Sequence, residues 1–262
     1  MGLTRVSKNE VAFSEPMWGR NAIINGNFDV WQRSTTDTSG GYRTVDRWFN
    51  SRNIASTTVT QRWFALGQTD VPHNPSFYAE FVATATTDAS TYATFDQGIE
   101  DVRTFSGETV TISFWAKANA TRTIGVQFRQ YFGTGGSPSA NVTVEQEVTL
   151  TTSWAKYELT FDIPSISGKT LGTDDNHYLR LLFWMSAGSN FSTEFPNVGE
   201  AGGTYHYAQV QVERGDIATR FETQTYAEVL HQCMRYCQVI QIYPWTNCFG
   251  MGDAVSASNW SG

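Results

Sequence analysis

The stretch Thr109-Val110-Thr111-Ile112-Ser113-Phe114-Trp115-Ala116 decides the fold of this 262-residue chain. Polar and apolar side chains alternate along it, which is the pattern of a β-strand with one apolar face. The apolar face consists of Val110, Ile112, Phe114 and Ala116. We therefore predict a strand that turns these four side chains towards a core.

Seven further short runs with a period of two follow the same pattern between residues 57 and 212. Clusters of Gly, Asn, Asp and Pro, such as Gly133–Pro138 and Gly172–Asn176, separate them as turns. Many short strands joined by turns, without a helical stretch among them, predict an all-β, antiparallel jelly-roll β-sandwich. The runs are Thr57–Phe64, Ser76–Val82, Thr123–Phe128, Val142–Leu150, Ala155–Phe161, Tyr178–Trp184 and Tyr205–Val212.

The chain divides into three segments that differ in residue pattern. Residues 1–20 lack periodicity and are predicted to form an extended N-terminal arm. Residues 21–222 carry the strand pattern and are predicted to form the jelly roll. Residues 223–262 are predicted to form a short C-terminal helix plus strand and the start of a tip or linker segment.

The C-terminal helix is predicted from helical spacing of apolar residues over Tyr226–Cys237. Thr225 and Glu228 have the spacing of a capping box at its first turn. Val239–Tyr243 follows as a predicted strand that ends at Pro244.

Charge and hydropathy exclude several classes of function. Lys and Arg number 18 against 25 Asp and Glu, so the net charge is −7, which disfavours nucleic-acid and anionic-membrane surfaces. The longest apolar stretch, around Leu181–Met185, is far shorter than the ~20 residues that span a bilayer. Residues 1–20 have no continuous apolar core, so we expect no signal peptide and no membrane insertion.

Few residues suggest catalysis. The four histidines, His73, His177, His206 and His231, stand in unrelated local contexts, and none forms a metalloprotease motif. Close acidic pairs such as Glu145 and Glu147 are most simply a solvated strand face, although glycosidases use two carboxylates. We therefore predict no catalytic residues and no cofactor, and glycoside hydrolysis stays open as an alternative.

Metal ligands are also sparse. His231, Cys233, Cys237 and Cys248 have a spacing that fits no familiar zinc module, and two cysteines one helical turn apart suit a buried face. A structural calcium ion near Asp29 stays open, but no loop has EF-hand spacing. We predict no metal site. Cysteines confined to the last 30 residues indicate a chain held by core packing and folded in a reducing cytoplasm.

Aromatic residues make up 14% of the chain and offer the best candidates for a binding site. Sugar rings stack their apolar faces on aromatic side chains while polar groups bond the hydroxyls. Trp63, Tyr92, Tyr131 and Phe132 lie in or beside polar segments that we expect to be exposed, and they are the candidate glycan-binding residues. Trp115 lies within an alternating strand, and we expect it to be buried.

A series of motifs over residues 21–237 resembles the carbohydrate-binding-module-like domains of bacteriophage tail fibre and virion proteins. The opening motif is Ile23-Ile24-Asn25-Gly26-Asn27-Phe28-Asp29-Val30-Trp31-Gln32-Arg33. The match to the short helix that follows this domain in the family is Cys233–Tyr236. The remaining motifs are Gly41–Tyr42, Asp46–Trp48, Val110–Ala118, Phe132–Ser139, Asp162–Thr173, Gln209–Gly215 and Ala218–Glu222.

The resemblance implies a non-enzymatic protein of the virion, made in the host cytoplasm, that forms a homotrimer and binds or faces bacterial surface polysaccharide. It also implies that the N-terminal arm docks on other virion proteins, and its candidate contacts are Arg5, Phe13 and Trp18. Two alternatives stay open at this point. One is a purely structural head or tail decoration or connector protein, and the other is a polysaccharide depolymerase.

Overall fold

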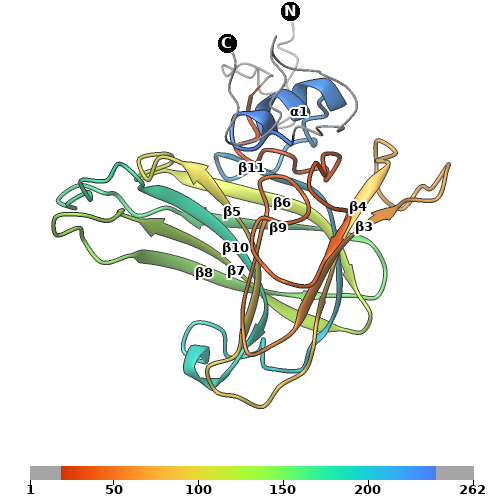
Figure 1. Cartoon of the computed structure of the whole chain (residues 1–262), viewed down its shortest axis with the longest axis horizontal. Helices are drawn as coiled ribbons and strands as arrows, with labels where there is room; N and C mark the ends of the chain where they lie inside the picture. The colour runs from red at the N-terminus through yellow and green to blue at the C-terminus, as the bar shows by residue number, and fades with distance from the viewer. Residues whose placement is uncertain (1–18, 240–262) are drawn as a thin grey trace, which may run out of the picture.

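Two antiparallel β-sheets packed face to face form the protein (Figure 1). The computed structural model describes residues 19–239. The predicted all-β jelly-roll sandwich is confirmed. One sheet has six strands in the order β1-β3-β4-β11-β6-β9, and the other has five in the order β2-β5-β10-β7-β8.

The strands of the six-stranded sheet are β1 (Thr36–Asp37), β3 (Thr57–Trp63), β4 (Phe77–Ala83), β6 (Thr109–Ala118), β9 (Ala155–Asp162) and β11 (Gly203–Arg214). Those of the five-stranded sheet are β2 (Phe49–Asn53), β5 (Tyr92–Glu100), β7 (Arg122–Tyr131), β8 (Val142–Leu150) and β10 (Tyr178–Ala187). Each of the eight runs of alternating residues coincides with one of these strands. Strands β1, β2 and β5 were not predicted.

The expected burial along β6 is confirmed. Val110, Ile112, Phe114 and Ala116 are fully buried in the space between the sheets. Trp115, on the opposite face of the strand, is half-buried, so its expected burial is wrong. Its position opposite Lys156 on β9 places it on the outer surface of the six-stranded sheet.

Aromatic rings join the two sheets at the centre of the core. Phe183 of β10 packs on Tyr207 of β11 and on Phe114 of β6, with ring centroids 4.9 and 5.0 Å apart. Phe95 of β5 stacks on Trp48 at 4.7 Å. Such pairs contribute about 0.5–1.5 kcal/mol each beyond the burial of their surface.

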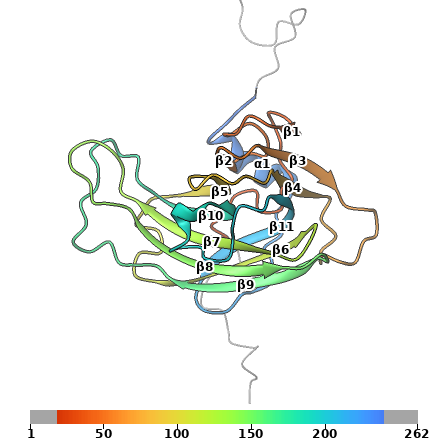
Figure 2. The ribbon, with the colours of Figure 1, turned by 90° about the horizontal axis from the view of Figure 1, so that it is seen from below.

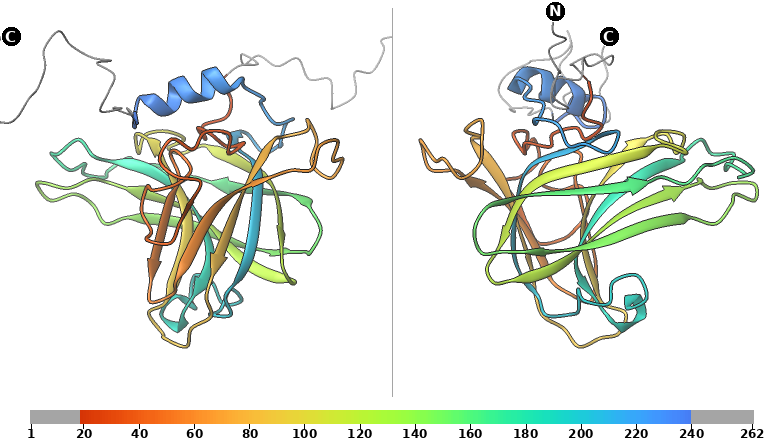
Figure 3. Two further views of the ribbon diagram at one scale, coloured as in Figure 1. Left: turned by 45° about the vertical axis from the view of Figure 1, so that its right-hand side comes forward. Right: turned by 180° about the vertical axis from the view of Figure 1, so that it is seen from behind.

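A loop covers one end of the outer face of the five-stranded sheet. Residues 188–202 follow β10, contain the 3₁₀ helix η2 (Ser189–Phe191), and lie at the end of the sandwich opposite α1 (Figure 3). Trp184 of β10 packs on Phe195 of this loop, with centroids 4.9 Å apart. Asn197 donates from its backbone and side-chain nitrogens to Glu147 of β8 at 2.8 and 2.7 Å. Glu147, which was expected on a solvated strand face, is therefore also a docking point for the loop.

Two long loops extend beyond the five-stranded sheet at the end away from the 188–202 loop (Figure 2). Residues 132–141 connect β7 to β8, which confirms the turn predicted at Gly133–Pro138. Residues 163–177 run beside them. The backbone N–H of Gly172 donates to the carbonyl of Phe132 at 2.7 Å, and that of Ser139 donates to Thr170 at 3.0 Å.

The predicted C-terminal helix is α1 (Tyr226–Met234), which begins with the predicted capping box between Thr225 and Glu228. Its buried face, Val229 and Cys233, packs on Val30. Packing in a core is therefore confirmed for Cys233. No helix within residues 19–239 is long and apolar enough to cross a membrane. The strand predicted at residues 239–243 falls almost entirely outside the described residues.

The start of the described chain is hydrogen-bonded to the segment between β11 and α1. The Glu222 carboxylate accepts hydrogen bonds from the backbone N–H groups of Gly19, Arg20 and Asn21 at 2.7, 2.9 and 3.0 Å. The rest of the predicted arm, residues 1–18, lies outside the described residues.

Replacing Gly125 by Ala tests how closely the 188–202 loop is packed. A methyl group at this position of β7 would overlap the ring of Phe195, so we expect Gly125→Ala to lower the free energy of unfolding by about 1–3 kcal/mol. The matched control is Gly98→Ala on β5, where the added carbon would lie 3.6 Å from Tyr178, an ordinary contact. Urea denaturation of both variants measures the difference, and equal stability would contradict the described packing.

The burial of Cys233 predicts selective thiol chemistry. Burial raises the pKa of the Cys233 thiol to about 12, so very little reactive thiolate forms near neutral pH. We expect iodoacetamide at pH 8 to modify the half-buried Cys237 and to leave Cys233 unmodified until the protein is denatured. Peptide mass spectrometry of native and urea-treated samples measures this, and equal labelling rates in the native protein would contradict it.

Candidate functional site

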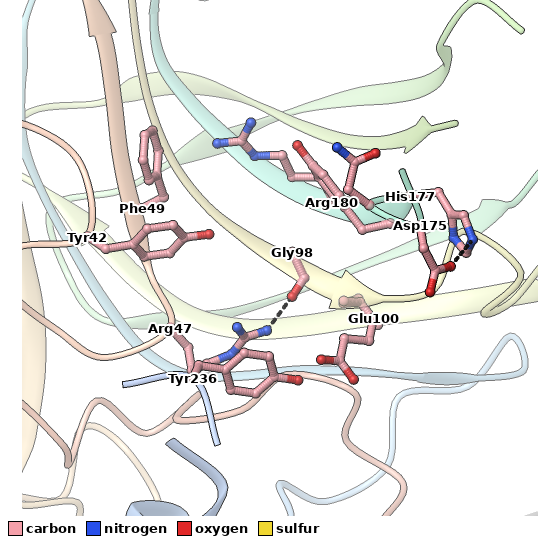
Figure 4. A pocket seen from close by; sticks show the side chains of 12 residues that line it. Tyr42, Arg47, Phe49, Gly98, Glu100, Asp175, His177, Arg180 and Tyr236 are labelled. Atoms are coloured by element: carbon pink, nitrogen blue, oxygen red, sulfur yellow. Dashed lines mark hydrogen bonds and ion pairs between the residues drawn. The ribbon is translucent and has the colours of Figure 1, made fainter. Parts of the chain in front are cut away.

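A cavity of about 480 Å³ lies on the outer face of the five-stranded sheet, at the end that the 188–202 loop leaves open. Strands β2, β5 and β10 form its floor, and the segment before β2, the loop before β10 and Tyr236 after α1 form its walls (Figure 4). The lining residues are Tyr42, Arg47, Phe49, Gly98, Ile99, Glu100, Asp175, Asn176, His177, Tyr178, Arg180 and Tyr236.

Strand register explains why polar side chains gather there. Phe183 and Leu181 of β10 point into the core, so Tyr178 and Arg180 reach the opposite face. On β5 the same alternation places Asp96 and Gly98 outwards, and Arg180 lies directly opposite Gly98. Gly98 has no side chain, which leaves room above the sheet at this point.

Two tyrosines from neighbouring strands form an aromatic pair beside the cavity. Tyr131 of β7 pairs with Tyr178 of β10 in the ladder, and their ring centroids are 4.9 Å apart with an interplanar angle of 37°. Both side chains are half-buried, so each ring keeps part of its surface accessible. An accessible pair of rings offers a stacking surface for a flat apolar ligand face.

A buried ion pair lies beneath the polar surface. Asp96 is fully buried and accepts hydrogen bonds from Arg180 at 2.8 Å and from Thr94 at 3.0 Å. Burial raises the pKa of the Asp96 carboxyl group, and the Arg180 guanidinium opposes that shift. The same pairing raises the pKa of Arg180 despite the burial of its side chain, so the pair fixes where this guanidinium points.

Residues that follow α1 build one wall of the cavity. The Arg47 guanidinium lies 3.4 Å from the centre of the Tyr236 ring and donates to the carbonyl of Gly98 at 2.6 Å. Arg235 donates to Glu100 at 2.6 Å. The motif Cys233–Tyr236 therefore ties the end of the helix to β5 at the edge of the cavity.

His177 stands between two carboxylates in the opposite wall. Its Nδ1 atom is 3.2 Å from Asp101 and its Nε2 atom is 3.4 Å from Asp175. His177 therefore lies where the loop before β10 meets the turn that follows β5. Among residues 19–239, no group of three or more His, Cys, Asp or Glu side chains is arranged to hold a metal ion.

The four predicted glycan-binding residues lie in different places. Tyr131 borders the cavity through its pair with Tyr178. Tyr92 lies on the same outer face but at the end covered by the 188–202 loop, against Trp184 and Phe191.

Trp63 and Phe132 lie elsewhere. Trp63 is 71% exposed at the end of β3, in the other sheet, where it packs on Phe77. Phe132 is 1% exposed, so its expected exposure is wrong. Its ring supports the paired loops beyond the sheet, 5.9 Å from the Lys169 ammonium group. Arg5, Phe13 and Trp18 of the predicted arm lie outside the described residues, and their docking role stays a prediction.

Most of the residues that line the cavity were not predicted from the sequence. Tyr178 and Arg180 belong to a predicted strand, and their alternation with buried leucines was a usable signal of an outward-facing position. Tyr42, Arg47 and Tyr236 belong to motifs of the stated resemblance but lie in three separate parts of the sequence. Their convergence depends on tertiary structure alone.

The family comparison matches residues 20–173 of the chain to a family described as "Carbohydrate binding domain" (CBM_4_9). The chain belongs to this family of carbohydrate-binding domains. The match ends before β10, so Tyr178, Arg180 and Tyr236 lie beyond it. No curated protein matches the sequence.

Solved structures with similar folds include carbohydrate-binding modules. One described as CBM4 is 21% identical with a TM-score of 0.38, and the alignment covers 73% of this chain and 98% of that one. A family 11 module from Clostridium thermocellum is 15% identical with a TM-score of 0.40, covering 70% and 98%. The enzymatically active domain of tailspike protein 4 from bacteriophage CBA120 is 16% identical with a TM-score of 0.44, covering 75% of this chain and 22% of that one.

A double-mutant cycle at Asp96 and Arg180 tests the buried pair. Removing one partner leaves the other charge buried, so we expect Asp96→Asn and Arg180→Met each to lower the free energy of unfolding by about 3–5 kcal/mol. The double variant should lose much less than the sum, because it leaves no buried charge.

The exposed pair Arg62–Glu80, on the other sheet, is the matched control, with an expected coupling of at most about 1 kcal/mol. Chemical denaturation measures both couplings. Additive effects at Asp96 and Arg180 would contradict the described ion pair.

Proposed function

We propose that this protein is a non-catalytic glycan-binding protein and that its ligand lies across the open half of the outer face of the five-stranded sheet. The observation that carries the proposal is the Tyr131–Tyr178 pair beside a cavity of about 480 Å³ with polar walls. Membership of a family of carbohydrate-binding domains supports it.

The chemistry of the cavity suits a sugar chain. Its volume lies within the range of about 300–1,000 Å³ common for ligand sites. The tyrosine rings offer apolar surface to the C–H face of a sugar ring. Arg180, Asn176 and Glu100 line the same space with donors and acceptors for hydroxyl groups.

We also propose that the protein is part of a bacteriophage virion, as a tail fibre, spike or surface decoration that adheres to bacterial surface polysaccharide. The support is the series of motifs from Ile23–Arg33 to Cys233–Tyr236 that resembles such proteins. Homotrimer formation and docking through residues 1–20 on other virion proteins belong to the same proposal.

Depolymerisation is the second candidate function. The arrangement that favours it is His177 held between Asp101 and Asp175 in a cavity wall, because carboxylates near a bound sugar are the groups that glycosidases use. A reducing-end assay on host polysaccharide separates the two functions. Binding without release of reducing ends supports adhesion, and sustained release with turnover would overturn the non-catalytic proposal.

Replacing Tyr178 by Ala tests the proposed site. We expect Tyr178→Ala to weaken binding to host polysaccharide by at least about tenfold, because truncation of a central aromatic contact costs on the order of 1–2 kcal/mol or more. The matched control is Tyr78→Ala, another half-buried tyrosine on the outer face of the six-stranded sheet, which should bind as the wild type does.

Affinity electrophoresis in gels that contain host capsular polysaccharide or lipopolysaccharide measures binding, and thermal unfolding verifies that both variants are folded. Equal loss in the two variants, or loss in neither, would place the site elsewhere.

A further inference from the structure

Arg129 is a half-buried cation on the outer face of β7 that forms no ion pair with any carboxylate in the described part of the chain. It stands directly opposite Arg180 in the β7–β10 ladder and two positions before Tyr131. Its only described side-chain hydrogen bond goes to the amide oxygen of Gln127, at 2.9 Å. Within residues 19–239, no carboxylate lies within 4 Å of its guanidinium, whereas Arg180 has Asp96 at 2.8 Å.

The surroundings of Arg129 disfavour a lone positive charge. Its side chain is half-buried, and like charges directly opposite each other on neighbouring strands are destabilising. Burial, and after it the proximity of Arg180, lowers the pKa of the Arg129 guanidinium. The carboxylate of Asp96, which opposes this lowering, is already bonded to Arg180. An anion from outside the protein would relieve this arrangement.

The geometry suits a carboxylate better than a neutral hydroxyl. An arginine fork binds a carboxylate through two parallel hydrogen bonds, and charge-assisted bonds are about twice as strong as neutral ones. The Tyr131–Tyr178 pair occupies the next row of the same face. A sugar ring stacked on this pair would carry an acidic substituent one row along the sheet, where Arg129 lies.

We propose that the site recognises a sugar residue that bears a carboxylate, a uronic acid, and that Arg129 is the residue that selects it. The inference rests on the proposed glycan-binding function and names its ligand class. The net charge of −7 does not oppose it, because charges more than about 8 Å apart are screened at physiological ionic strength. The groups next to the ligand therefore determine the preference.

Glu145 is an acidic side chain near Arg129, and replacing it tests whether the ligand is an anion. It lies on the same outer face, opposite Gln127, and its Oε2 atom is buried without a hydrogen-bond partner. An anionic ligand gains nothing from Glu145. We therefore expect Glu145→Gln to bind an acidic glycan as tightly as the wild type or more tightly.

The experiment compares acidic and neutral forms of the same polymers. Uronate-containing bacterial polysaccharides are tested together with samples whose carboxyl groups have been reduced to alcohols, which preserves the linkages and removes the charge. Neutral bacterial polysaccharides complete the panel. We expect the wild type to bind an acidic polymer, to bind it more weakly at higher salt, and to lose at least about tenfold in affinity after reduction.

Arg129→Gln should show a similar loss on the acidic polymer and no further loss on the reduced one. Its thermal midpoint should not fall, since the variant removes a like charge opposite Arg180. The matched control is Arg62→Gln, an arginine on the outer face of the six-stranded sheet, which should bind as the wild type does.

The outcomes separate this inference from the proposed function. Equal affinity for the acidic and reduced polymers, or for wild type and Arg129→Gln on the acidic polymer, would overturn the role of Arg129 and leave glycan binding intact. Binding to neutral polysaccharides alone would likewise overturn the role of Arg129 and leave glycan binding intact. Absence of binding to every polymer would contradict the proposed function, and this inference with it.

Discussion

The pairing of Phe183 with Phe95 in the β10–β5 ladder is the constraint on which the site depends. Both rings point inwards and pack against the aromatic side chains of the other sheet, where Tyr207 lies 4.9 Å from Phe183. Because side chains alternate along a strand, this packing sends Arg180 and Asp96 to the opposite face. A slip of one residue would bring their charges into the core and the rings into solvent. The packing of the core therefore fixes the strand register, and the register fixes which side chains reach the site.

The outer face of the five-stranded sheet is divided into a closed half and an open half. Apolar packing of Trp184 and Phe195 closes one half, and the absence of a side chain at Gly125 makes the contact possible. The open half carries Tyr178 and Arg180 and the cavity. The 188–202 loop therefore limits how much of the sheet a ligand can occupy.

Sequence alone was sufficient for the strands whose two faces differ in polarity. Strand β6 alternates between polar and apolar residues except at Trp115, and its register follows from that pattern. Strand β5 was missed because residues unfavourable in strands occupy it: Asp96 and Gly98 face outwards, and Gln97 takes an inward position. Gln97 is accommodated there because its amide exchanges two hydrogen bonds with the backbone of Ile24, both at 2.9 Å. Its partner is 73 residues away, so no local pattern could reveal it.

The candidate site was less predictable than the fold for a related reason. Composition indicated exposed aromatic side chains, and of the four chosen, Tyr131 borders the cavity. Tyr131 forms an aromatic pair with Tyr178, which lies 47 positions later in the sequence. The two rings meet only because β7 and β10 are neighbouring strands. The wall residue Tyr236 comes from beyond the last strand and is held by Arg47.

The family match and the cavity overlap only in part, and that has a consequence for specificity. Residues 20–173 carry the family pattern, including β5 with Gly98 and Glu100. Strand β10 and the end of α1, which supply Tyr178, Arg180 and Tyr236, lie outside it. The shared part supplies the scaffold together with Arg129 and Tyr131, while Tyr178, Arg180 and Tyr236 come from the remainder. The proposed ligand contacts are therefore divided between the two parts. Membership of the family therefore accounts for the fold of the sheet. The chemistry of its outer face has to be derived from this chain's own residues.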